Sequence, residues 1–111
     1  MANPSKNIDL TAMHSAAMQA SGLLKVLSNP DRMMLLCQLT QGEHSVSELE
    51  TALGIGQPTL SQQLAVLRDE RLVHTRREGK QVFYSIASAE AMAVLQLLYA
   101  LYCPKTEGGT S

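Results

Sequence analysis

Between residues 45 and 69, the apolar positions follow the 3.6-residue period of two successive helices. The first begins at a capping box formed by Ser45 and Glu48 and ends at Gly54-Ile55-Gly56, where both glycines are expected to supply the backbone angles of a tight turn. The second has Pro58 in its first turn, where a missing N–H costs little. Its core-facing stripe consists of Leu60, Leu64 and Leu67. Two such helices joined by a tight turn predict a helix-turn-helix unit.

The next segment has the alternating pattern of a β-hairpin. We predict a strand from Leu72 to Arg77, a turn at Glu78-Gly79-Lys80, and a second strand from Gln81 to Ile86. One face of the second strand carries Val82, Tyr84 and Ile86. Phe83 breaks the alternation and indicates that this strand packs on both sides. A hairpin directly after a helix-turn-helix unit predicts a winged helix-turn-helix DNA-binding domain.

Three further helices flank this unit. One begins at Pro30 with Asn29 as its N-cap, and the other two span about residues 10–27 and 89–102. The fold class is therefore mainly α (α+β), with the element order ααααββα. The first and last helices carry broader apolar stripes than the core of a small domain needs. These stripes favour a homodimer formed through the first and last helices, and the alternative is that both helices simply cover a monomer.

The length and charge of the chain indicate its domain organisation and the kinds of partner that it can bind. We expect one domain over residues 10–103 with disordered tails at 1–9 and 104–111. No stretch approaches the roughly 18 apolar residues of a membrane span, and the chain starts without a signal-peptide pattern, so a cytoplasmic protein without a membrane partner is expected. The formal net charge of −1 gives no overall basicity. Binding to nucleic acid must therefore depend on local charge.

Polar side chains gather at the start of the second helix of the unit, and basic ones gather near the hairpin. The candidates for contacts with base edges are Gln57, Thr59, Ser61, Gln62 and Gln63. The candidates for positioning the phosphate backbone are Arg68, Arg77, Lys80 and Gln81. Each residue alone is better explained as part of a solvated surface, but the cluster after a tight turn favours double-stranded operator DNA as partner. A symmetric dimer would address half-sites roughly 10 or 20 base pairs apart.

The two cysteines are Cys37, within the helix that begins at Pro30, and Cys103, at the end of the last helix. Cys37 is readily explained as a buried structural thiol. That explanation is weaker for Cys103, because a thiol at a helix end beside a flexible tail is expected to be accessible. Cytosolic cysteines do not normally form structural disulfides, so a pair that can meet suggests reversible redox chemistry.

The segment from Leu60 to Arg68, with Leu72-Val73 and the wing ending Val82-Phe83-Tyr84, resembles the signature of the ArsR/SmtB repressors. The resemblance covers about residues 23–103 and includes the helix junction at residues 27–32. It implies a dimeric repressor that leaves its operator when an inducer binds. One departure is Glu70-Arg71, where these proteins often have a small residue and glycine.

Many members of that family sense metals, but both familiar metal sites are missing from this sequence. Ser45-Val46-Ser47 stands where arsenic and cadmium sensors place two thiolates, and hydroxyls are poor ligands for soft metals. Zinc sensors place Asp and His along the last helix, which here has neither. No metal or other cofactor is therefore expected. A metal-responsive repressor with a non-standard site of His14, Cys37 and Cys103 stays open as the alternative.

The Cys37 and Cys103 positions, together with residues 54–64 and the final Tyr102-Cys103, are similar to the persulfide-responsive SqrR/BigR-type branch and to the nearby HlyU-type regulators. The resemblance implies that a persulfide, polysulfide or related oxidant links Cys37 to Cys103 by a di- or polysulfide bridge and so releases operator DNA. A small thiol enzyme or sulfur carrier is disfavoured, because no cysteine has a recognisable base beside it.

Overall fold

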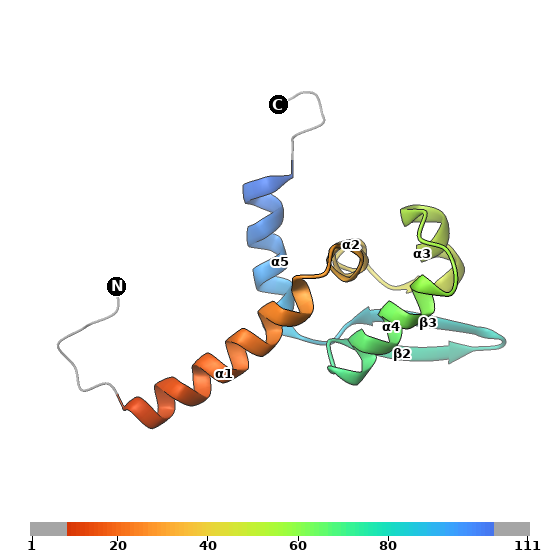
Figure 1. Ribbon diagram of the computed structural model, residues 1–111. Helices are drawn as coiled ribbons and strands as arrows, with labels where there is room; N and C mark the ends of the chain where they lie inside the picture. Colours follow the sequence, from red (N-terminus) through yellow and green to blue (C-terminus); the bar gives the residue numbers. More distant parts are fainter. Residues whose placement is uncertain (1–8, 104–111) are drawn as a thin grey trace.

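The computed structural model describes residues 9–103 and has a three-stranded sheet among five helices (Figure 1). The helices are α1 (Leu10–Leu27), α2 (Pro30–Leu39), α3 (Val46–Leu53), α4 (Thr59–Asp69) and α5 (Ala89–Tyr102). The strands are β1 (His44–Ser45), β2 (Val73–Glu78) and β3 (Gln81–Ile86). Helices α3 and α4 form the helix-turn-helix and β2–β3 form the wing, so the predicted winged helix-turn-helix fold is confirmed.

The predicted element order needs one correction, because β1 lies between α2 and α3. Its two residues pair antiparallel with β3, with His44 opposite Tyr84 and Ser45 opposite Phe83. The sheet order is therefore β1-β3-β2, with the wing strand β3 in the centre. Two residues are too few to show an alternating pattern, and β1 exists only because β3 offers it a pairing edge.

Leucine side chains from several helices form one core around α2. This helix packs against α1, α3, α4, α5 and β3. The fully buried members of the core include Leu35, Leu36, Leu49, Leu60, Leu64, Leu67 and Leu95. The three leucines predicted as the core-facing stripe of α4 are thus confirmed, and their burial leaves the opposite face of α4 in solvent.

Side-chain caps define where the helices begin. The Asn29 side chain accepts a hydrogen bond from the backbone N–H of Arg32 at 3.0 Å, as expected for the N-cap of α2. Both halves of the predicted capping box are present: the Glu48 N–H donates to Ser45 Oγ at 3.2 Å, and the Ser45 N–H donates to the Glu48 carboxylate at 2.8 Å. The position of Pro58 differs slightly from the prediction, since it is the N-cap of α4 and precedes the first helical residue.

A residue with a left-handed backbone follows each of the two helices of the helix-turn-helix. Gly54 ends α3 with φ of 69°, whereas Gly56 does not adopt a positive φ, so only one of the two glycines supplies the expected unusual angle. After α4, Arg71 has φ of 63°. This is the position where the resemblance led us to expect glycine, and an arginine there pays a steric cost that glycine would not.

Helix α1 projects from the rest of the molecule (Figure 1). Only Val26 and Leu27, in its last turn, are buried, while residues 10–22 are exposed throughout. Asp9, which we had assigned to the N-terminal tail, instead caps α1 by accepting the N–H of Thr11 at 2.9 Å. The remaining predicted tail residues, 1–8 and 104–111, lie outside the described part of the chain. Within that part, no helix is long and apolar enough to cross a membrane.

Candidate DNA-binding surface and cysteine pair

The start of α4 presents a polar surface to solvent. Gln57, Ser61 and Gln62 are exposed, and Thr59 is half-buried. The Ser61 hydroxyl donates to the side-chain oxygen of Gln57, one turn earlier. This contact ties the two side chains together on the surface that faces away from the leucine stripe. Amide and hydroxyl groups held on the N-terminal half of a recognition helix have the chemistry needed to contact base edges in the major groove.

Gln63 differs from its neighbours because its amide oxygen is already engaged within the protein. It is half-buried, and its Oε1 accepts a hydrogen bond from Nη1 of Arg32 at 3.0 Å. Arg32 lies in the first turn of α2, 31 residues earlier in the chain. Sequence periodicity had placed Gln63 on the flank of α4 without indicating any partner.

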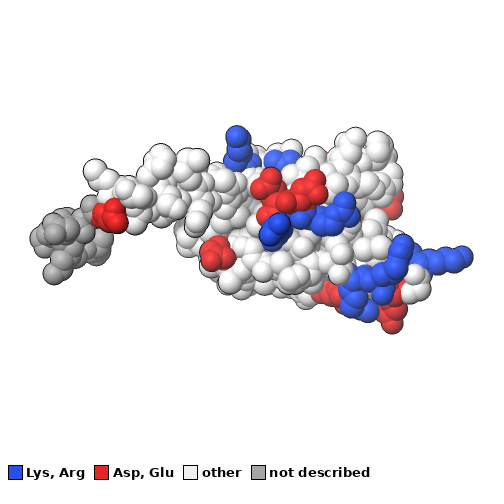
Figure 2. All heavy atoms as spheres, turned by 90° about the horizontal axis from the view of Figure 1, so that it is seen from below, with Lys and Arg blue, Asp and Glu red and all other residues white. Residues whose placement is uncertain are grey.

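The wing carries exposed polar and basic side chains at its turn. Gly79 and Lys80 connect β2 to β3, and Gly79 has the left-handed φ of 63° that such a two-residue turn requires. Arg77, Lys80 and Gln81 are all exposed. Figure 2 shows basic side chains gathered at this end of the molecule, with acidic ones beside them. The local positive charge expected from the sequence is therefore present at the wing despite the formal net charge of −1.

Among the described residues, Arg76, unlike Arg77 and Lys80, is paired with carboxylates. Its guanidinium donates to both carboxylate oxygens of Glu43 at 2.9 Å and to Glu78 at 3.0 Å, and it lies 4.7 Å from the centre of the Phe83 ring. These hydrogen bonds lower the pKa of Glu43 and raise that of Arg76. The contacts attach the wing to the segment before β1 and cover the second face of β3, where Phe83 had broken the alternation.

The structure does not bring every predicted cation to one place. Arg68 is exposed in the last turn of α4, away from the wing turn that carries Lys80 (Figure 1). It therefore lies at the opposite end of α4 from Gln57 and Thr59.

The two cysteines lie on neighbouring helices, Cys37 on α2 and Cys103 at the end of α5. Cys37 is half-buried on α2, and Cys103 is exposed as the residue that ends α5. A hollow of about 260 Å³ between the two helices is lined by Cys37, Thr40, Gln41, Leu95, Gln96 and Tyr99. The Cys103 N–H donates to the carbonyl of Tyr99, one turn earlier on the wall of that hollow, at 3.0 Å. Burial, and to a smaller extent the charge of a Cys103 thiolate, raise the pKa of Cys37.

The histidines do not complete a metal site with these thiols. Within residues 9–103, no group of three or more His, Cys, Asp or Glu side chains could hold a metal ion. His14 lies exposed on the projecting part of α1, and His44 is engaged with Gly42 O at 2.7 Å and with Gln38. The alternative site of His14, Cys37 and Cys103 is therefore not assembled in this subunit.

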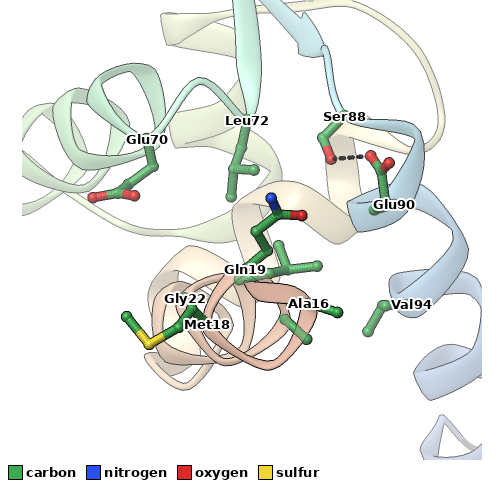
Figure 3. Close-up of a pocket in the computed structure, with 11 residues that line it drawn as sticks. Ala16, Met18, Gln19, Gly22, Glu70, Leu72, Ser88, Glu90 and Val94 are labelled. Carbon is green, nitrogen blue, oxygen red and sulfur yellow. Dashed lines mark hydrogen bonds between the residues drawn. The ribbon is translucent and has the colours of Figure 1, made fainter. Parts of the chain in front are cut away.

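A second, larger hollow of about 650 Å³ lies where α1 passes the end of α4 and the start of α5. Its walls are mainly small or apolar, with Ala16, Leu23, Leu72 and Val94 among them. Figure 3 shows Gln19 reaching into the hollow between Leu72 and Val94. On the same helices, the exposed large apolar side chains are Leu10, Met13, Met18, Leu24, Leu97, Tyr99, Leu101 and Tyr102.

Comparison with known proteins places this arrangement in a family. Residues 29–75, which contain the helix-turn-helix, match the profile described as "Bacterial regulatory protein, arsR family". The biofilm growth-associated repressor of Agrobacterium fabrum is 52% identical over 100 residues, which cover 90% of this chain and 86% of the relative. The chain belongs to the ArsR family. Members of this family are DNA-binding transcriptional regulators and typically dimers, so this ArsR-family protein is a regulator and not an enzyme.

Two solved structures extend the similarity of this ArsR-family chain. The transcriptional repressor BigR from Xylella fastidiosa is 48% identical, with a TM-score of 0.80 over 87% of this chain and 99% of that one. Reduced HlyU from Vibrio cholerae N16961 is 43% identical, with a TM-score of 0.80 over 84% of this chain and 98% of that one. The expected likeness to the BigR and HlyU branch of the family is thus confirmed.

Proposed function

We propose that this protein is a dimeric transcriptional repressor that leaves its operator when reactive sulfur bridges Cys37 and Cys103. The observation that carries the proposal is the proximity of the two thiols. Cys37 lines the hollow between α2 and α5, and Cys103 ends α5 one turn after Tyr99, a residue of that hollow. One thiol is exposed and can meet a dissolved sulfur donor first. The other is half-buried, and its pKa is raised by burial and, to a smaller extent, by the charge of a Cys103 thiolate, which supports the proximity that a resolving thiol needs.

On the DNA side, the exposed start of α4 would enter the major groove and the wing would contact the flanking backbone. Gln57, Thr59, Ser61, Gln62 and Gln63 are proposed to lie at or near the base edges. Arg68, Arg77, Lys80 and Gln81 are proposed as the phosphate contacts. Because Arg76 is neutralised by two carboxylates, the affinity would depend on the cations that remain unpaired at the wing.

The dimer is proposed to form through α1 and α5. The exposed apolar side chains on these helices include Leu101, 64% exposed, and Tyr102, 79% exposed, which a single subunit leaves in water. The 650 Å³ hollow between α1 and the start of α5 is lined by the exposed Met18 and by small side chains such as Ala16 and Ala20, which permit close approach. A second copy of the chain covering this surface would hold two recognition helices at a defined separation.

The chemistry requires an oxidised sulfur donor, such as an organic trisulfide, RS–S–SR. The Cys103 thiolate attacks the donor, forms Cys103–S–S–SR and releases RS⁻. The Cys37 thiolate then attacks the sulfur bonded to Cys103 Sγ and expels a second RS⁻, which leaves one sulfur atom between the two Sγ atoms. In total, two thiols and one trisulfide give one bridging trisulfide and two RSH. With a persulfide, RSSH, the Cys103 thiolate first takes the outer sulfur, forms Cys103–S–SH and releases RSH. The Cys37 thiolate then attacks Cys103 Sγ, which gives a direct disulfide and releases H₂S.

Either bridge would tie α2 to α5 within one subunit. Since α5 also belongs to the proposed dimer interface, the tie would change how the two subunits are held and hence the separation of the recognition helices. DNA whose half-sites match the reduced dimer would then bind more weakly.

The test follows mass and DNA binding on the same samples. The operator probe is a duplex selected from a random pool by the reduced wild-type protein. Reduced wild type, Cys37→Ser, Cys103→Ser and the double variant are each exposed to glutathione trisulfide, and their intact mass and operator affinity are then measured. We expect wild type alone to gain one sulfur, lose two hydrogens and release the probe. An unchanged affinity in bridged wild type, or normal release by Cys37→Ser, would refute the proposal.

A further inference from the structure

The side chain of Arg32 bridges the end of α1 and the recognition helix α4. Its Nε donates to the carbonyl oxygen of Val26 at 2.8 Å, and its Nη1 donates to Gln63 Oε1 at 3.0 Å. Arg32 is itself fixed at the start of α2, because its backbone N–H donates to the Asn29 cap at 3.0 Å. One half-buried guanidinium thus holds three helices at a single point.

The hydrogen bond to Val26 satisfies a backbone carbonyl that lacks its usual helical donor. A helical carbonyl usually accepts the N–H of the residue four positions later, and the residue four after Val26 is Pro30, which has no N–H. Arg32 Nε supplies the missing donor to a carbonyl in a buried part of the chain. A cation at this end of α1 also opposes the partial negative charge of the helix terminus.

The bond to Gln63 fixes the other side of the bridge. Gln63 follows Gln62, whose exposed side chain is a proposed base contact, so a shift at Gln63 shifts Gln62 as well. Arg32 donates to two neutral oxygens, the carbonyl of Val26 and the amide oxygen of Gln63. Its planar guanidinium holds the two N–H donors in a fixed geometry. A lysine, with a single ammonium group on a flexible chain, cannot reproduce that geometry.

We infer that Arg32 is a positioning residue that sets the orientation of the recognition helix relative to α1. Because α1 packs against the core of its own subunit near its C-terminal end, through Leu23, Val26 and Leu27, this point governs how a dimer built on α1 would present its two α4 helices. The inference rests on the proposed function for the roles of α1 and α4 and does not depend on the cysteines. Loss of the Arg32 hydrogen bonds to Val26 and Gln63 should therefore reduce preference for the operator more than general affinity for DNA.

The test is a double-mutant cycle on the reduced protein. Arg32→Lys, Gln63→Met and the double variant are compared with wild type on the selected operator duplex and on a scrambled duplex of equal length. Each single variant should lower the ratio of operator to scrambled affinity by roughly tenfold, and the double variant should lose no more than the worse single variant, because both remove one interaction. Thermal unfolding of every variant is recorded in parallel.

Asn29→Ala is the matched control, since it weakens the same helix junction but leaves both donors of the Arg32 side chain in place. It should lower thermal stability while keeping the affinity ratio near that of wild type. The inference is overturned if Arg32→Lys keeps the wild-type ratio, if the losses of the single variants multiply, or if Asn29→Ala loses the ratio to the same extent. A wild-type protein that binds the operator but ignores glutathione trisulfide would refute the thiol switch alone.

Discussion

Raising the pH from 8.5 to 9.5 should accelerate closure of the bridge between Cys37 and Cys103. In the proposed sequence, the exposed thiol reacts first and the Cys37 thiolate then attacks it, so the closing step depends on the ionised fraction of Cys37. Burial, with a smaller effect from the charge of Cys103, raises the pKa of Cys37. Because desolvation disfavours the thiolate, Cys37 ionises at a higher pH than an ordinary exposed thiol does.

The size of the acceleration distinguishes a raised pKa from an ordinary one. A thiol with a pKa of about 8.5 is half ionised at pH 8.5 and roughly nine-tenths ionised at pH 9.5, so its rate rises less than about twofold. A thiol whose pKa is raised gains more over the same interval, up to a limit of about tenfold per pH unit. The closing rate should therefore rise more than the roughly twofold expected for an ordinary thiol.

The rate is measured by acid quenching and intact mass, at glutathione trisulfide concentrations high enough that closure no longer depends on the donor. Cys103→Ser, alkylated by iodoacetamide across the same pH range, reports the titration of Cys37 alone, and Cys37→Ser reports that of Cys103. Circular dichroism at pH 9.5 checks that the fold persists. A closing rate that levels off near pH 8.5, with Cys103→Ser titrating as an ordinary thiol, would contradict the role assigned to Cys37.

Three further predictions concern DNA binding and the backbone. Lys80→Ala should weaken binding to all duplexes about equally and reduce the dependence of affinity on salt concentration by about one phosphate contact. Anisotropy titrations at several salt concentrations measure the slope of log affinity against log salt concentration. An unchanged slope would show that the wing does not contact the DNA. Gln62→Ala should instead change base preference at one position of the selected duplex, which repeated selection with the variant would reveal or refute. Arg71→Gly should keep or slightly raise stability in urea unfolding, because φ of 63° suits glycine, whereas the control Arg68→Gly inside α4 should lose about 1 kcal/mol. Equal losses would show that the left-handed backbone at Arg71 carries no strain.

Local sequence signals were sufficient for the helices and the wing. The start of α3 depends on two residues three positions apart, Ser45 and Glu48, and the start of α2 depends on Asn29 and the following proline. Both partners of such a cap lie within one helical turn, so a short stretch of sequence is enough to predict it. The positive φ at Arg71 is different, because the short path from α4 into β2 imposes it against the preference of the residue.

The missed features all depend on partners distant in sequence. Strand β1 requires the edge of β3, about 40 residues later. Arg76 and Glu43 are separated by 33 positions, and Arg32 and Gln63 by 31. Arg32 had one local signal that could have found it, since a proline four residues after Val26 leaves that carbonyl without its helical donor. Nothing local indicated that the same guanidinium also reaches α4.

The two proposals meet on α2, and their combination constrains how a signal can travel. Cys37 lies on this helix five positions after Arg32, and the whole helix is ten residues, about 15 Å, long. A helix this short moves as a rigid body, so a bridge that draws Cys37 toward α5 must also displace the Arg32 end. That end holds both the last turn of α1 and Gln63 on α4. If this linkage operates, Arg32→Lys should still form the sulfur bridge at the normal rate but show a smaller change in operator affinity on bridging than wild type does.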